Sequence, residues 1–123
     1  MSRFSIQTLN NISSVGVKKL PEKRYTIAND VAAPDAILVR SQKMHDLPIP
    51  ESVRAIGRAG AGTDNIPVAK LSARGVPVFN APGANANAVN ELVLTALLLA
   101  SRNLVPALKF VSEMPDSDDK SLH

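Results

Sequence analysis

Apolar and polar positions along this chain form a series of short strand-like runs over residues 1–80. Clusters of Gly, Pro, Asn and Asp separate one run from the next. The run at residues 36–40 is continuously apolar and ends in an arginine, which is typical of a central parallel strand whose far end meets solvent at a ligand site. We predict five strands, at residues 4–9, 24–28, 36–40, 53–58 and 76–80.

Helical patterns lie between these strands. Residues 12–20 predict a short helix, and a second helix is expected after the fourth strand. Asp64 or Asn65 would cap this second helix. Pro67 would lie in its first turn and Gly75 just past its end. Strands that alternate with helices indicate an α/β fold, a flavodoxin-like three-layer arrangement around one parallel sheet, with ligands at the carboxyl ends of the strands.

The clearest helical pattern runs over residues 87–103 and is apolar nearly all round. Such a helix must be covered on more than one side, so we expect another domain or another subunit to contact it. The chain is therefore expected to self-associate through residues 87–103. After Pro106 the helical pattern is lost, and residues 105–123 are interpreted as a polar tail.

Composition narrows the classes of function. The net charge of +3 suits small anionic ligands, whereas scattered basic residues and 3% aromatic residues argue against a nucleic-acid-binding surface. The absence of cysteine excludes disulfides and thiolate metal sites, and no metal site is predicted. The most apolar window, residues 92–100, is about half of the ~20 residues that cross a bilayer. No membrane partner is expected, and the predicted location is the cytoplasm.

A glycine-rich turn after the fourth strand is the strongest candidate for a binding site. Gly60 and Gly62 flank Ala61, so successive backbone N–H groups in this turn can face one negatively charged ligand. Arg58 at the end of the strand adds a permanently charged, forked donor. Arg40 at the end of the third strand would be its neighbour, because the carboxyl ends of parallel strands share one edge of the sheet.

Three segments in order also resemble a known family. They are residues 37–41 (ILVRS), 57–65 (GRAGAGTDN) and 78–91 (VFNAPGANANAVNE). Together they resemble the amino-terminal part of the NAD-dependent D-2-hydroxyacid dehydrogenases, and the resemblance covers roughly residues 1–110.

This resemblance implies a two-domain enzyme whose substrate domain is built from both ends of the chain, with a nucleotide-binding domain inserted between them. Residues 1–104 would form the first segment of the substrate domain, ending in its connecting helix, and residues 105–123 would lead toward the nucleotide-binding domain. The implied reaction is the oxidation of 3-phospho-D-glycerate to 3-phosphohydroxypyruvate with NAD, in serine biosynthesis.

The resemblance also implies roles for individual residues. Two arginines would meet the phosphate or carboxylate of the substrate, and the backbone of the glycine turn would hold the carboxylate near the nicotinamide. Ala61 and Val89 would contact the cofactor. The implied substrate-binding residues are Arg40, Arg58, Gly60, Ala61 and Gly62.

The catalytic apparatus of that family does not match this sequence. The chain has no Gly-x-Gly-x-x-Gly run, which a dinucleotide fold places at a strand-to-helix turn. The catalytic arginine, glutamate and histidine of the family lie in its later part, and His45 and His123 match neither of the family's positions. The sequence is interpreted as a truncated part of the enzyme that is inactive alone, with no catalytic residue of its own and no tight binding of NAD.

Two other functions stay open. One is a different D-2-hydroxyacid dehydrogenase, such as a glyoxylate or hydroxypyruvate reductase. The other is a non-catalytic flavodoxin-like module for anion binding or assembly. Paired arginines favour a doubly anionic, phosphorylated substrate, because an uncharged hydroxymethyl end would leave one guanidinium unused.

Overall fold

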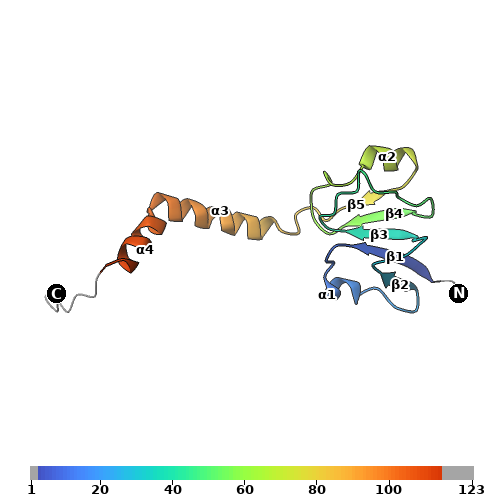
Figure 1. The fold of residues 1–123 in the computed structure, drawn as a ribbon, viewed down its shortest axis with the longest axis horizontal. Helices are drawn as coiled ribbons and strands as arrows, with labels where there is room; N and C mark the ends of the chain where they lie inside the picture. Colours follow the sequence, from blue (N-terminus) through green and yellow to red (C-terminus); the bar gives the residue numbers. More distant parts are fainter. Residues whose placement is uncertain (1–2, 115–123) are drawn as a thin grey trace. The chain divides into compact units, whose positions relative to one another are not determined.

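Five parallel strands form one sheet in the order β2-β1-β3-β4-β5 (Figure 1). The computed structural model describes residues 3–114. Every neighbouring pair of strands is parallel, and this strand order is that of the flavodoxin-like folds. The predicted α/β class is therefore confirmed. The strands are β1 (Phe4–Leu9), β2 (Tyr25–Ala28), β3 (Ala36–Val39), β4 (Ala55–Arg58) and β5 (Val78–Phe79).

All five predicted strands are present. Strand β1 has its predicted bounds, β2 and β3 are each one residue shorter, and the last two are shortened further. Strand β4 starts two positions late because the N–H of Val53 bonds to the Pro50 carbonyl in a turn (3.2 Å). Strand β5 starts after Pro77, which has no N–H to contribute to a ladder. The carbonyl of Pro77 still accepts a hydrogen bond from Ile56 N (3.0 Å).

The core is centred on the two middle strands. Ile37 of β3 and Ile56 of β4 are partners in the sheet register, and both are buried. Helix α2 (Val68–Ala73) adds the fully buried Leu71. The buried cluster consists of Ile37, Val39, Met44, Val53, Ile56, Ile66, Leu71 and Val76. It anchors β3 and β4, whose carboxyl ends carry the two arginines.

The helices near the sheet differ from prediction in detail. Helix α1 (Ser14–Val17) is only one turn long. The N-cap position of α2 is Pro67, so the prediction that Asp64 or Asn65 caps this helix is wrong. Gly75 follows the end of α2 with φ +72°, as predicted for a helix stop.

Residues 86–123 form a separate unit with two described helices, α3 (Ala86–Ser101) and α4 (Leu104–Ser112). Neither helix buries a residue. The predicted long helix is confirmed within two residues at each end. In the described part, no single helix is long and apolar enough to cross a bilayer, although α3 and α4 together reach that length and composition as a pair bent by 62°.

Helix α4 lies where the sequence predicted no helix. Pro106 is its third residue, and a proline in the first turn removes an N–H that has no partner inside the helix anyway. Asn103 has the left-handed backbone conformation (φ 51°) and lies at the bend between α3 and α4. The assignment of residues 105–123 to a segment leading to another domain stays a prediction, and residues 115–123 lie outside the described part.

Candidate functional site

A cavity of about 550 Å³ lies at the carboxyl ends of β3 and β4. Its walls come from residues 40–41 after β3, from residues 58–62 at the end of β4, and from three residues after β5. These last three are Ala81, Ala84 and Asn85. In open α/β sheets this edge is where ligands bind. The sheet therefore brings three separate segments of the sequence to one binding-sized space.

The cavity contains both arginines that the sequence singled out. Val39 is the register partner of Arg58, so Arg40 follows β3 immediately beside the end of β4. Arg40 is exposed and Arg58 is partly buried. Two arginines in one lining suit an anion chemically, because a guanidinium is a permanently charged, forked donor. Their roles in binding stay predictions.

Gly60 lets the guanidinium of Arg58 lie against the loop. The φ of Gly60 is +153°, a conformation that L residues rarely adopt. A Cβ atom at this position would lie 3.1 Å from Cζ of Arg58 and would clash with its Nη1. The glycine therefore serves two purposes, backbone geometry and close approach of a charged side chain.

Hydrogen bonds fix the direction of the loop's peptide groups. The carbonyl of Gly60 accepts from Ala81 N (3.0 Å), and the carbonyl of Ala61 accepts from Asn80 Nδ2 (2.6 Å). In a trans peptide the next N–H points opposite to the carbonyl. The N–H groups of Ala61 and Gly62 therefore point away from residues 80–81.

These two N–H groups are the donors of the loop that stay available. Gly60 N already donates to the Arg58 carbonyl (3.0 Å). Within residues 3–114, no protein acceptor takes a hydrogen bond from the N–H of Ala61 or Gly62. The sequence predicted the backbone of all three residues as the anion contact, and the structure narrows the available donors to two.

Asn65 forms hydrogen bonds to both arginines, to the side chain of Arg58 and to the backbone of Arg40. Its Oδ1 accepts from Arg58 Nε (3.3 Å), and its Nδ2 donates to the carbonyls of Arg40 (3.4 Å) and Gln42 (2.9 Å). Only 7% of Asn65 is exposed. The sequence missed this role because an asparagine shortly before a helix matches the N-cap pattern equally well.

The remaining candidates lie elsewhere. Val89, predicted to contact cofactor, lies on α3 in the second unit and is half exposed. The Nε2 of His45 lies 2.9 Å from the carbonyl oxygen of Asp64, beside the loop. In the described part no group of His, Cys, Asp or Glu could hold a metal ion.

At the opposite, amino-terminal edge of the sheet, Asp35 has a structural role. Its carboxylate accepts bonds from the backbone N (2.8 Å) and the Oγ (3.1 Å) of Ser5. These bonds, aided by the charge of Arg54, lower the pKa of Asp35 because they favour its ionised form. Asp35 joins β1 to the start of β3 and does not line the anion cavity.

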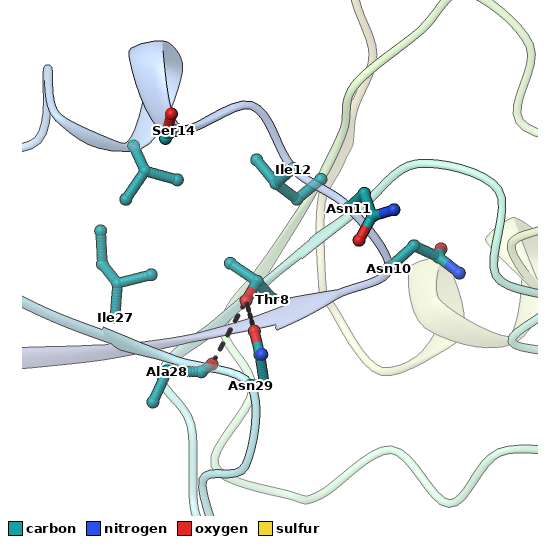
Figure 2. Close-up of a pocket in the computed structure, with 9 residues that line it drawn as sticks. Thr8, Asn10, Asn11, Ile12, Ser14, Ile27, Ala28 and Asn29 are labelled. Carbon is teal, nitrogen blue, oxygen red and sulfur yellow. Dashed lines mark hydrogen bonds between the residues drawn. The ribbon is translucent and has the colours of Figure 1, made fainter.

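A second cavity, of about 340 Å³, lies at the ends of β1 and β2 (Figure 2). Its lining is neutral and includes the amides of Asn10, Asn11 and Asn29. The buried hydroxyl of Thr8 donates to Asn29 Oδ1 (2.6 Å), as Figure 2 shows. Because no charged side chain lines this cavity, it suits an anion less well than the cavity with the two arginines.

Comparison with known proteins agrees with this arrangement. The sequence profile of the family described as "D-isomer specific 2-hydroxyacid dehydrogenase, catalytic domain" matches residues 3–114. A D-3-phosphoglycerate dehydrogenase from Archaeoglobus fulgidus is 36% identical over 93 residues, which are 73% of this chain and 18% of that protein.

Two further relatives are similar over comparable stretches. An erythronate-4-phosphate dehydrogenase from Salinibacter ruber is 37% identical over 95 residues, 76% of this chain and 24% of that protein. A D-3-phosphoglycerate dehydrogenase from Mycobacterium leprae is 42% identical over 76 residues, 59% of this chain and 14% of that protein. The chain thus spans about a fifth of the length of the curated relatives it matches. With its parallel sheet, its two-arginine cavity and a profile match over all of residues 3–114, this chain belongs to the D-isomer specific 2-hydroxyacid dehydrogenase family.

Proposed function

We propose that this chain supplies the substrate-anion site of a dehydrogenase that oxidises 3-phospho-D-glycerate to 3-phosphohydroxypyruvate with NAD, a step of serine biosynthesis. The observation that carries the proposal is that one cavity is lined by two arginines and by the two loop residues whose backbone N–H groups are available, Ala61 and Gly62. Such donors bind anions strongly, because each hydrogen bond to a charged group contributes about 1.5–3 kcal/mol.

The pair of arginines supports a substrate with two anionic ends. A phosphate ester carries roughly −1.5 to −2 charges near neutral pH, and a carboxylate carries one more. Arg40 and Arg58 offer one fork to each end, and the N–H groups of Ala61 and Gly62 can share the carboxylate. The names of the relatives agree with this chemistry, since both 3-phosphoglycerate and erythronate 4-phosphate are phosphorylated acids.

The chain's own residues bind and orient the substrate in this proposal. They do not fit the phosphates of a dinucleotide, because Gly57, Gly60 and Gly62 lack the Gly-x-Gly-x-x-Gly spacing. The loop they form also leads through a turn to α2, which is only six residues long. No step of hydride transfer is therefore assigned to this chain, and the cofactor contacts of Ala61 and Val89 stay predictions.

A titration of the ¹⁵N-labelled chain, followed by NMR in phosphate-free buffer, tests the proposal. Adding 3-phospho-D-glycerate should shift the backbone amides of Ala61 and Gly62 and the Nε–H of Arg58. D-Glycerate is the matched control, since it has the same carbon skeleton without the phosphate. The phosphorylated acid should bind at least about tenfold more tightly, the gain from one added charge-assisted hydrogen bond.

Two results would argue against this assignment. Equal affinity for both acids would remove the case for a phosphorylated substrate and favour an unphosphorylated 2-hydroxy acid. Shifts confined to residues outside the cavity would overturn the anion site itself. The Arg40→Ala variant separates the two ends of the substrate, because it should weaken binding of the phosphorylated acid much more than binding of D-glycerate.

A further inference from the structure

The amide of Asn65 uses both of its chemical functions inside the protein. A primary amide has two N–H donors and an acceptor oxygen on one planar group. Both donors go to backbone carbonyls, those of Arg40 and Gln42, and the oxygen accepts from Arg58 Nε. Within residues 3–114, no buried side-chain nitrogen or oxygen lacks a partner. The amide is thus buried, and both its nitrogen and its oxygen are hydrogen-bonded. These bonds allow the side chain one orientation.

Two of these three bonds reach the arginines, and the third reaches Gln42, two residues after Arg40. The bond to Nε fixes the plane of the Arg58 guanidinium, which leaves its two terminal NH₂ groups for a ligand. Nη1 is the group that lies against Gly60. The bonds to the Arg40 and Gln42 carbonyls fix the backbone from which the side chain of Arg40 projects.

The segment after β3 is also held from the other side. Asn10, which has φ 64°, follows β1. Its Oδ1 accepts bonds from the backbone N of Ser41 (3.2 Å) and Gln42 (2.5 Å). Residues 41–42 therefore lie between two asparagine amides. The β3–β4 register sets how far apart the two backbones lie. Of the two asparagines, only Asn65 also bonds to the Arg58 side chain, so it is the side chain that links the segment after β3 to that guanidinium.

We propose that Asn65 is a positioning residue that sets the spacing and orientation of Arg40 and Arg58, and thereby makes the cavity selective for an acid with two anionic ends. This inference rests on the proposed function. An amide suits this role and a carboxylate does not, because the carboxylate would face the carbonyls of Arg40 and Gln42 without a donor and would neutralise Arg58.

The test compares Asn65→Ala with a control of similar burial. Thr8→Val also removes a hydrogen bond of a buried polar side chain, since Thr8 is 8% exposed. Thr8 lines the neutral cavity (Figure 2), and neither arginine is among the residues that line that cavity. Both variants should lower the melting temperature. Only Asn65→Ala should weaken binding of 3-phospho-D-glycerate, by about tenfold or more, and only it should make the Arg58 Nε–H mobile in ¹⁵N relaxation measurements.

A second variant covers the case in which Asn65→Ala does not fold. Asn65→Asp keeps the size of the side chain and an acceptor for Arg58, so the Arg58 Nε–H should stay ordered while affinity for the doubly anionic acid falls. A double change with Arg58→Ala should weaken binding by less than the product of the two single effects, because the two residues act together.

The outcomes separate this inference from the proposed function. If the unaltered chain binds no acid, the proposed function fails, and the mobility of Arg58 in the Asn65 variants still tests the positioning role. If the unaltered chain binds and Asn65→Ala changes only the melting temperature, with affinity and Arg58 mobility as in Thr8→Val, Asn65 is structural and the inference is wrong.

Discussion

Replacing Gly60 with alanine should separate the anion site from the stability of the fold. The added Cβ would lie 3.1 Å from Cζ of Arg58 and would clash with Nη1, so the guanidinium must move away from the loop. Moving it removes at least one charge-assisted bond to the ligand, worth about 1.5–3 kcal/mol. That energy corresponds to a roughly 10- to 150-fold weaker affinity. The positive φ adds backbone strain of about 1–3 kcal/mol to the folded state.

The assay measures both quantities on the same samples. NMR titration with 3-phospho-D-glycerate gives the affinity, and urea denaturation gives the free energy of unfolding. Gly75→Ala is the matched control, because Gly75 also has a positive φ, of +72°, but a Cβ there would meet no atom within 4 Å. Both variants should be less stable, and only Gly60→Ala should lose affinity. An unchanged affinity in Gly60→Ala would refute the contribution of Arg58 to anion binding.

Three further predictions concern other parts of the molecule. In Asp35→Asn, the free energy of unfolding should depend less on pH at the acid end. The stability from the lowered pKa of Asp35 is fully present above the ordinary Asp pKa of about 4, and it is lost as pH falls through the folded-state value. An unchanged pH dependence between about pH 2 and 5 would contradict this. Leu71→Ala should lower the free energy of unfolding by about 2–5 kcal/mol, because Leu71 is fully buried; a loss under about 1 kcal/mol in urea denaturation would mean that α2 does not anchor the core. We propose that the chain self-associates through α3, whose Leu92 and Leu98 are 69% and 66% exposed. Light scattering should show a molar mass that rises with protein concentration and that is lower in a Leu92→Lys, Leu98→Lys double variant. A monomer at high concentration would count against self-association.

Local patterns were enough to predict the sheet. The apolar runs at β1 and β3 begin where predicted, because alternation and continuous apolar stretches reflect burial directly. Helix ends were predicted less well. The sequence predicted no helical pattern after Pro106, whereas the first turn of α4 accommodates this proline.

The site was predictable only in part, for a similar reason. Arg40, Arg58 and the glycine turn stand out because arginines that end apolar strands, one of them followed by closely spaced glycines, form a pattern typical of an anion site. Asn65 and Asn80 did not stand out, since asparagines near turns serve mostly as caps and turn formers. Their roles depend on partners 7 to 25 residues away in the sequence.

By itself, the sequence determined the α/β class, the number of strands and the glycine-rich segment that we propose as the anion site. These features follow from hydrophobic periodicity and from glycine, which act over a few neighbouring residues. Only the tertiary structure decided which N–H groups of the loop stay available and how the two arginines are held. Those properties arise where the ends of β3, β4 and β5 meet, because hydrogen bonds between distant segments use some donors and leave others for a ligand.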